Sequence, residues 1–308
     1  MNLLVGATGF VGGHLVEYLF QQGEISKGVF RKGAHLKIMD SSGVQGMEAD
    51  LADHHSLHEA MEGVDVVYNL ASPMPYSGGA GFLSANTEGL LNLLEVATEA
   101  KAKTFVHLST LDVYGFAAKA ILPGEPFRPG NEYQRSKVEA ERLLQEFSKR
   151  SAQPRIVIVR AAKAVGSRDE SLVVPLLRMI VAGRVVVPSG GLMSYSHPRD
   201  IAQAMYKAAL GQPASGSAFL VKSFDSAPED IARGVASAVG RSVSFKNEGL
   251  FSGSAIPKYA SEQLKASPRI DVQPTWKELG YVPQYDLPKT CEEIASWYKK
   301  EPWVAEGA

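Results

Sequence analysis

At the start of the chain stands Asn2-Leu3-Leu4-Val5-Gly6-Ala7-Thr8-Gly9-Phe10-Val11-Gly12-Gly13-His14-Leu15-Val16. Its opening apolar run is typical of a strand that is buried on both faces of a parallel sheet. Glycines follow at positions 6, 9 and 12, and the apolar residues after them recur at helical spacing. A strand that turns through glycines into a helix exposes backbone N–H groups and the positive end of a helix dipole. We therefore predict an anion site here, suited to the pyrophosphate of a dinucleotide.

The three glycines have separate roles in such a turn. Gly6 permits the tight turn, Gly9 lets the phosphates approach the backbone, and Gly12 lets the helix pack closely on the strand. The expected pyrophosphate-binding surface comprises Gly6, Thr8, Gly9, Phe10, Val11 and Gly12.

Composition and charge narrow the class of protein. The chain has 308 residues, of which 45% are hydrophobic and 21% charged, and its formal net charge is −1. Such a balance predicts neither a nucleic-acid nor a membrane surface, so the expected partner is a small-molecule substrate. Cys291 is the single cysteine, which excludes an intrachain disulfide. The first strand begins at Asn2 and no apolar run approaches the roughly 18 residues of a membrane span, so we expect a soluble cytoplasmic protein.

Apolar segments that read as buried strands alternate with helical patterns through the first half of the chain. This rhythm predicts an α/β fold with a doubly wound parallel sheet over residues 1–165, to which 196–223 return. After Gly166 the segments shorten, and we expect a smaller lobe built from 166–195 and 224–308. The predicted strands cover 25–30, 44–49, 64–71, 103–108, 155–160, 184–187 and 218–221, and the main predicted helices 10–22, 86–100, 133–149, 172–182 and 196–210.

Two basic residues follow the second predicted strand. An acidic residue at this place accepts from the ribose 2′-hydroxyl of NAD, whereas Arg or Lys suits the 2′-phosphate of NADP. Arg31 and Lys32 therefore favour NADP, with NAD as the alternative cofactor and a solvated turn as the alternative interpretation. His54 and His58 share a helical face at metal-ligand spacing, but no further ligand completes a site, so no metal is predicted.

Tyr133 and Lys137 form a Tyr-x-x-x-Lys pair at the start of a predicted helix. Residues four apart share a helical face, so the phenol and the ammonium can point into one site. A phenol has a pKa of about 10, and a neighbouring ammonium lowers it by stabilising the phenolate. Such pairs are common on solvated helices. The glycine turn upstream and Ser109-Thr110 at the end of an intervening strand make this pair a candidate catalytic site.

With these motifs in this order, the chain resembles the extended short-chain dehydrogenase/reductase family, the NAD-dependent epimerases and dehydratases. Spacing of three between the glycines, in place of a Gly-x-Gly opening, also favours this family. The segments that carry the resemblance are Gly6-x-x-Gly9-x-x-Gly12, Asp50-Leu51, Asn69-Leu70-Ala71, Asn86-x-x-Gly89-x-x-Asn92, Phe105 to Gly115, Glu125-Pro126, Pro129, Tyr133-x-x-Ser136-Lys137, and Leu279 to Pro283 with Thr290 and Trp297.

The resemblance implies a role for each residue of the candidate site. Tyr133 would be the acid/base, and Lys137 would lower its pKa and hydrogen-bond the nicotinamide ribose. Thr110, with Ser109 as the lesser candidate, would hold the substrate oxygen. The further cofactor contacts implied are Asp50 and Leu51 at the adenine, Leu70, Ala71 and Asn86, and the substrate candidates are Ser72, Tyr114, Lys163 and Tyr195.

Two segments depart from the pattern of nucleotide-sugar enzymes in this family. The segment from Arg160 to Gly166 lacks the usual proline and has Lys163 near the position of an Asn that contacts the sugar nucleotide. The later segment keeps Arg199-Asp200 but lacks the upstream Arg that binds phosphate. Both departures count against a nucleotide-sugar substrate, although Lys163 or Arg199 could still meet a diphosphate.

Three functions remain open at this point. The first is an NADP-dependent oxidoreductase for the carbonyl or secondary alcohol of a small or lipophilic substrate, as in the hydroxysteroid dehydrogenase and dihydroflavonol reductase branches. The second is a nucleotide-sugar epimerase, dehydratase or reductase, and the third is a non-catalytic NADP-binding regulatory protein. The resemblance also implies a homodimer built on the helices over 86–100 and 133–149, where Leu93 or Leu143 could make the contact, and core packing explains those leucines equally well.

Overall fold

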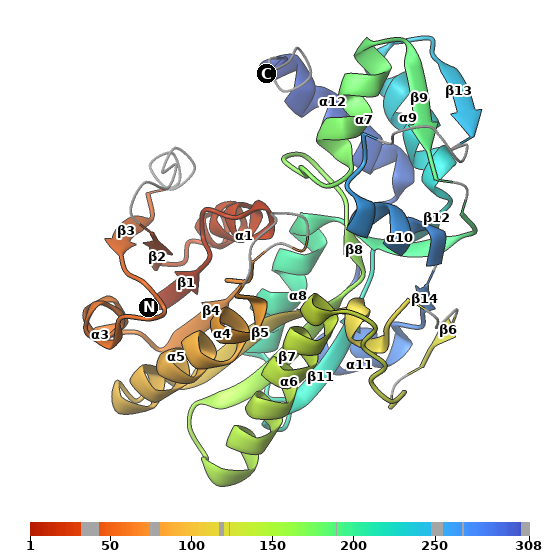
Figure 1. Cartoon of the computed structure of the whole chain (residues 1–308). Helices are drawn as coiled ribbons and strands as arrows, with labels where there is room; N and C mark the ends of the chain where they lie inside the picture. The colour runs from red at the N-terminus through yellow and green to blue at the C-terminus, as the bar shows by residue number, and fades with distance from the viewer. Residues whose placement is uncertain are drawn as a thin grey trace.

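A computed structural model describes residues 1–31, 43–73, 75, 81–116, 120–122, 124–188, 190–247, 255–266 and 268–302. Its main sheet has seven parallel strands in the order β11-β7-β5-β4-β1-β2-β3, as seen in Figure 1. The predicted doubly wound parallel sheet is therefore confirmed. Its strands are β1 (Asn2–Val5), β2 (Ser26–Phe30), β3 (Gln45–Glu48), β4 (Val66–Asn69), β5 (Thr104–Thr110), β7 (Arg155–Ala161) and β11 (Ser217–Val221).

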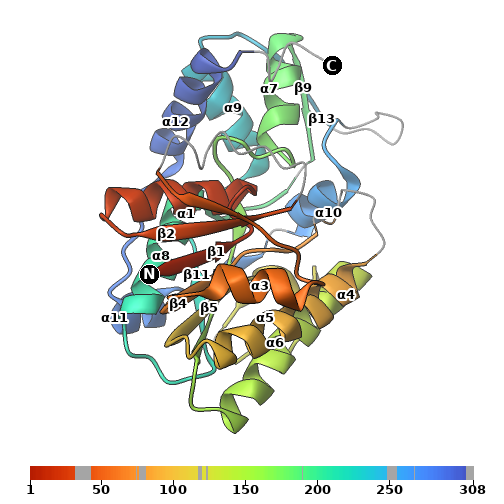
Figure 2. The same ribbon diagram turned by 90° about the vertical axis from the view of Figure 1, so that its left-hand side faces the viewer.

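Helices cover both faces of this sheet. Neighbouring residues of β1 point to opposite faces, so Leu4 belongs to the apolar core under α1 and α8, whereas Leu3 and Val5 belong to the core under α3, α5 and α6. Figure 2 shows α1 on one side of the strands and α3, α5 and α6 on the other. The bounds are α1 (Phe10–Gln21), α3 (His54–Met61), α4 (Phe82–Asn86), α5 (Glu88–Glu99), α6 (Glu132–Arg150) and α8 (Pro198–Leu210).

Most of the remaining elements gather beyond the carboxyl ends of the strands, at the upper right of Figure 1, whereas the short helix α11 (Gln273–Leu279) lies lower, against β11 and α8. Their largest apolar core joins α7, α9, α10 and α12, including Leu176, Val235, Leu264 and Ile294. We call this part the smaller lobe. Its elements and the short segments that connect it to the sheet are β6 (Ala120–Ile121), β8 (Lys163–Ala164), α7 (Val173–Val181), β9 (Arg184–Val187), β10 (Met193–Ser196), β12 (Phe224–Ser226), α9 (Pro228–Val239), β13 (Ser244–Asn247), α10 (Lys258–Ala266), β14 (Arg269–Ile270), α11 (Gln273–Leu279) and α12 (Leu287–Lys300).

The helix predicted over 86–100 is interrupted. α4 ends at Asn86, Thr87 has φ −119° and ψ −68°, and α5 begins at Glu88. The helical pattern of this stretch predicts Leu90, Leu91, Leu94 and Ala97 on the buried side. Three of them are buried, but the prediction is wrong for Leu91, because 41% of it is exposed. The break at Thr87 starts a new helix, and Leu91 lies on its outer face. Leu93, one of the two leucines considered for a dimer contact, is fully buried in the core of its own chain.

The helix predicted over 196–210 begins two residues later. Ser196 ends β10, which pairs with β8 and β12 and was not predicted. Pro198 occupies the first helical position, where its missing N–H does no harm, and the His197 side chain accepts from the N–H of Arg199. Over the part of the chain that the structure describes, no helix has the length and apolar character needed to cross a bilayer.

Candidate active site

The turn after β1 accepts only glycine at two positions. Gly6 has φ +92°, and a Cβ there would lie 2.8 Å from the Ala71 nitrogen. A Cβ at Gly12 would lie 2.0 Å from the Gly6 carbonyl oxygen. Gly9 is the N-cap of α1. It has no side chain to form a cap hydrogen bond with the first backbone N–H groups of the helix. These features fit a dinucleotide pyrophosphate, which is the group that the sequence predicted here.

Gly12→Ala is expected to destabilise the protein by roughly 1–3 kcal/mol, because α1 must move away from β1 to relieve the contact. The same displacement disturbs the expected pyrophosphate site, so the Kd for a nicotinamide dinucleotide should rise. Urea unfolding and fluorescence titration with NADH and NADPH measure the two effects. Gly130→Ala is the matched control, since a Cβ there would lie 3.5 Å from its nearest neighbour. Equal behaviour of the two variants would show that the close approach at Gly12 has no role.

The residues expected at the adenosine end lie at the same edge of the sheet. β2 runs parallel to β1, so Arg31, which is exposed and directly follows β2, lies on the side of the glycine turn. Lys32 lies outside the described residues. Asp50 accepts from the Ala52 N–H through Oδ1 at 2.9 Å. Leu51 is held by α5, where a Cβ on Gly89 would lie 2.9 Å from the Leu51 Cβ and Asn92 donates to the Leu51 carbonyl at 2.8 Å.

α6 begins beside the end of β5 and carries the Tyr-x-x-x-Lys pair in its first two turns. Asn131 caps this helix by accepting from the Gln134 N–H at 2.9 Å. Lys137 Nζ donates to the Leu108 carbonyl at 3.0 Å, which docks the pair onto the strand that ends in Thr110. The family-implied cofactor contact Asn86 is buried and donates to Ser136 Oγ at 2.9 Å. Ser136 Oγ donates to the Tyr133 carbonyl at 2.8 Å, so Asn86 braces the first turn of α6.

Lys137 has an unusual environment for a lysine. Burial lowers the pKa of Lys137 to about 8, and the negative charges of Glu141 and Asp112 oppose that shift. His107, whose pKa burial holds well below its usual value, lies with Nε2 3.5 Å from Lys137 Nζ. Asn69 contacts the other ring nitrogen at 3.2 Å. Lys137 follows Tyr133 by about one helical turn, so the amine and the phenol stand on the same face of α6.

The two hydroxyls at the end of β5 have different surroundings. Ser109 donates to Glu141, which forms a buried ion pair with Arg160 at 2.6 Å. Tyr114 also joins this network, since its hydroxyl accepts from Arg160 at 2.7 Å. Thr110 Oγ1 accepts from the Asp112 N–H at 3.2 Å, and its hydroxyl also hydrogen-bonds the Asp112 carboxylate. Thr110 is partly exposed, whereas Ser109 and Tyr114 are buried in the network around Glu141.

The other substrate candidates come from two places in the fold, Ser72 from the end of β4 and Lys163 with Tyr195 from the paired strands β8 and β10. Ser72, just beyond β4, donates to the Pro73 carbonyl at 3.3 Å. Lys163 and Tyr195 are both buried and lie side by side, as register partners on the neighbouring strands β8 and β10. Lys163 donates to Ser171 Oγ at 3.0 Å, while the Tyr195 hydroxyl has no hydrogen-bond partner among the described residues. These two side chains are thus parts of the smaller lobe's interior.

Aromatic rings that no sequence motif predicted surround Tyr133. Phe82 from α4 and Tyr259 from α10 contact the Tyr133 ring, and Phe116 contacts Tyr259. None of these rings belongs to a motif, and Tyr259 lies in the part of the chain with the fewest motifs. An aromatic residue following the Tyr-Gly of the β5 segment was the one available signal, at Phe116.

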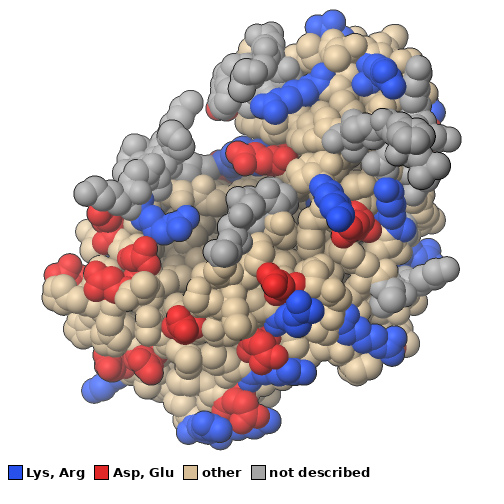
Figure 3. All heavy atoms as spheres, viewed as in Figure 1, with Lys and Arg blue, Asp and Glu red and all other residues tan. Residues whose placement is uncertain are grey.

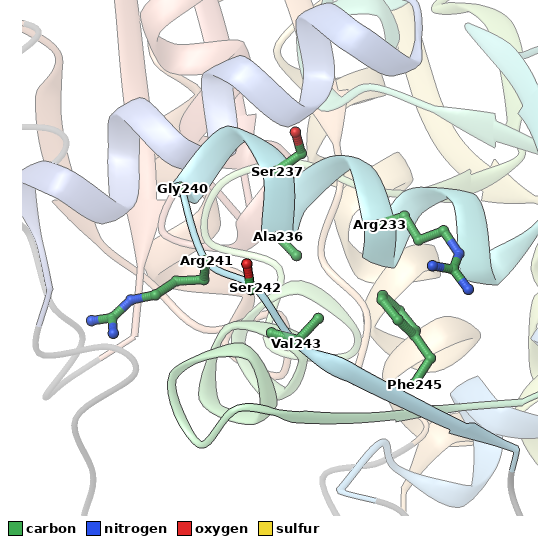
Figure 4. A pocket seen from close by; sticks show the side chains of 8 residues that line it. All are labelled: Arg233, Ala236, Ser237, Gly240, Arg241, Ser242, Val243 and Phe245. Carbon is green, nitrogen blue, oxygen red and sulfur yellow. The ribbon is translucent and has the colours of Figure 1, made fainter.

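Neither the surface charge on the face in Figure 3 nor the pocket between α9 and β13 marks a second reaction site. Acidic and basic side chains are interspersed on the face shown in Figure 3. A pocket of about 400 Å³ lies between α9 and β13, but its two arginines, Arg233 and Arg241, point apart in Figure 4, and Arg233 stacks on Phe245. Among the described residues, no group of His, Cys, Asp or Glu could hold a metal ion, and His54 and His58 are exposed.

The chain is similar in sequence to one protein family and to individual relatives, and in fold to a solved structure. The model of the "NAD dependent epimerase/dehydratase family" matches residues 2–219. Sterol demethylase protein B of Methylococcus capsulatus is 28% identical over 71% of this chain and 69% of its own length. The 4-hydroxy-2-methyl-3-oxo-4-farnesyl-3,4-dihydroquinoline-1-oxide ketoreductase of Stigmatella aurantiaca is 26% identical over 75% and 70%. A crystal structure of UDP-glucose 4-epimerase superposes with a TM-score of 0.82 at 19% identity over 98% of both chains.

Proposed function

The chain belongs to the NAD dependent epimerase/dehydratase family, whose members are NAD(P)-dependent, and we propose that it is an NADP-dependent oxidoreductase. It transfers a hydride between the nicotinamide and a carbonyl or secondary alcohol of a small or lipophilic substrate. The observation that carries the proposal is the hydrogen bond from Lys137 to the Leu108 carbonyl near the end of β5. This bond ties the helix that carries Tyr133 to the strand that ends in Thr110. That strand ends at the same edge of the sheet as the strand before the glycine turn.

The residues of the site divide the proton chemistry between them. The nicotinamide, when bound, supplies or accepts the hydride at the substrate carbon. Tyr133 donates its phenolic proton to the carbonyl oxygen in reduction and accepts the alcohol proton in oxidation. Lys137 stabilises the phenolate, and the Thr110 O–H donates to the substrate oxygen as negative charge develops there.

Two relatives favour the lipophilic class of substrate. The names of the Methylococcus and Stigmatella proteins refer to a sterol and to a farnesylated quinoline oxide. The family description and the fold likeness to UDP-glucose 4-epimerase favour a second candidate, a nucleotide-sugar epimerase, dehydratase or reductase working with the same three residues.

A substrate panel separates the two candidates. We expect NADPH consumption with apolar ketones, and no thermal stabilisation by UDP-, dTDP- or GDP-sugars in the presence of either cofactor. Stabilisation by a nucleotide-diphosphate sugar, together with turnover of that sugar, would establish the second candidate instead. Hydride transfer to any carbonyl also excludes a purely regulatory role.

Arg31→Asp is expected to reduce the preference for NADPH over NADH at least tenfold. A hydrogen bond to a charged phosphate contributes about 1.5–3 kcal/mol, and the new carboxylate repels the 2′-phosphate. Kd values for both cofactors, measured by fluorescence titration, report the change. Arg150→Asp is the control, because Arg150 is 81% exposed and ends α6, far along the helix from the site. An unchanged preference in Arg31→Asp would remove Arg31 from the cofactor site.

A further inference from the structure

Tyr133 is surrounded by aromatic rings from separate elements. Its ring meets Phe82 of α4 at a centroid distance of 5.7 Å and an interplanar angle of 78°. It meets Tyr259 of α10 at 5.4 Å and 84°. Tyr259 in turn meets Phe116, which follows the turn after β5, at 5.3 Å and 64°. All four rings are only partly buried, so each keeps some accessible surface.

A buried carboxylate holds α10 against the catalytic segment. Asp112 lies two residues after Thr110 and is 5% exposed. Its Oδ2 accepts from the Tyr259 hydroxyl at 2.7 Å, and its Oδ1 accepts from Gln263 Nε2 at 2.8 Å. Tyr259 and Gln263 are one helical turn apart, so both donors reach the same carboxylate. The Tyr259 hydroxyl is thereby turned inward, and the carbon atoms of its ring are left to face the site.

From this arrangement we propose that Phe82, Phe116 and Tyr259 form an apolar wall that receives a ring system flanking the reacting carbon. Asp112 is the positioning residue that holds Tyr259 in this wall. The ligand class is a cyclic or polycyclic ketone, or the corresponding secondary alcohol, without a phosphate. The inference rests on the proposed hydride transfer and adds the chemistry of the substrate beside the carbonyl.

The energetics of recognition favour such a ring over a sugar. Contacts between aromatic rings stabilise a bound ring beyond the area that they bury. The wall presents no free hydrogen-bond donor, since the two phenylalanines have none and the Tyr259 hydroxyl donates to Asp112. A pyranose placed against it would lose water from its hydroxyls without gaining partners, which disfavours its binding.

Two ketones of different size test the wall through activity. We would measure kcat and KM of wild type, Tyr259→Phe and Tyr259→Ser with a 3-ketosteroid and with butanone, in the presence of NADPH. Tyr259→Ser should raise KM for the ketosteroid at least tenfold and change kcat/KM for butanone less than about twofold. Tyr259→Phe retains the ring and should recover most of the lost affinity for the ketosteroid. An equal loss for both ketones in Tyr259→Ser would reduce Tyr259 to a general structural role and overturn the proposal.

A binding measurement keeps this test independent of turnover. Equilibrium dialysis of labelled 3-ketosteroid against NADP-saturated protein gives Kd directly. Tyr133→Phe should bind the steroid as wild type does, whereas Tyr259→Ser should bind it at least tenfold more weakly. Tight binding without turnover would refute the hydride transfer and leave the wall intact. Wild-type affinity in Tyr259→Ser, or no steroid binding by wild type, would refute the wall. Tyr206→Ser is the control, because Tyr206 makes a similar edge contact with Tyr18 on the opposite side of the sheet from α6.

Discussion

Tyr133→Phe is expected to lower the rate of hydride transfer at least a hundredfold and to leave the fold and NADPH affinity unchanged. A positioned acid/base contributes about 10²–10⁴ to the rate of such a reaction. Phenylalanine keeps the ring, so the contacts with Phe82 and Tyr259 persist and only the hydroxyl is lost. Single-turnover oxidation of NADPH with a saturating ketone measures the effect on chemistry alone.

The control for this variant is Tyr206→Phe, which removes a phenol that donates to Glu24 at 3.0 Å on the opposite side of the sheet from α6. It should retain the full rate. The Kd for NADPH and the urea midpoint of Tyr133→Phe should match those of wild type. A Tyr133→Phe enzyme with more than a tenth of the wild-type rate would mean that another group supplies the proton.

Glu141→Leu is expected to destabilise the protein by about 3–5 kcal/mol, because it leaves the Arg160 guanidinium buried without its counter-charge. Glu141 is fully buried and accepts from Arg160 through both carboxylate oxygens, at distances from 2.6 to 3.0 Å. The Ser109 hydroxyl loses its acceptor in the same variant. Urea unfolding monitored by circular dichroism gives the free energy of unfolding.

Two further variants make this result specific. Glu139→Leu removes the partner of Arg142 on the exposed face of the same helix, where 45% of Glu139 is accessible, and should have little effect. The double variant Glu141→Leu/Arg160→Leu removes both charges and should recover much of the lost stability. A double variant as unstable as the single one would show that side-chain shape, and not the unpaired charge, dominates.

The sheet and the cofactor turn could be predicted because local chemistry determines both. Leu3 and Val5 are apolar on a strand buried from two sides, and Gly6 and Gly12 stand where any Cβ would collide with backbone. Asp53 caps α3 through the same kind of local chemistry, since a carboxylate before a helical pattern accepts from the first free N–H groups. Each signal lies within a few residues of the structure that it specifies.

The remainder depends on contacts between distant segments. β10 is a strand because β8 and β12 pair with it, and Met193–Ser196 alone has no pattern that requires one. Tyr259 reaches Tyr133 because α10 packs in the smaller lobe and Asp112 accepts from the Tyr259 hydroxyl, a contact between residues far apart in the chain. The roles of Thr110, Tyr133 and Lys137 as catalytic residues stay predictions, to which the structure adds their surroundings.

The position of β11 has a consequence for biosynthesis. β11 pairs with β7 at the edge of the main sheet, yet more than fifty residues that include α7, β9 and β10 separate the two strands in the chain. While a ribosome is still producing those residues, β7 lacks its outer partner, and the unpaired N–H and C=O groups along that edge are open to pairing with other nascent chains. We therefore expect the chain to be most prone to such pairing between the synthesis of Ala161 and that of Val221.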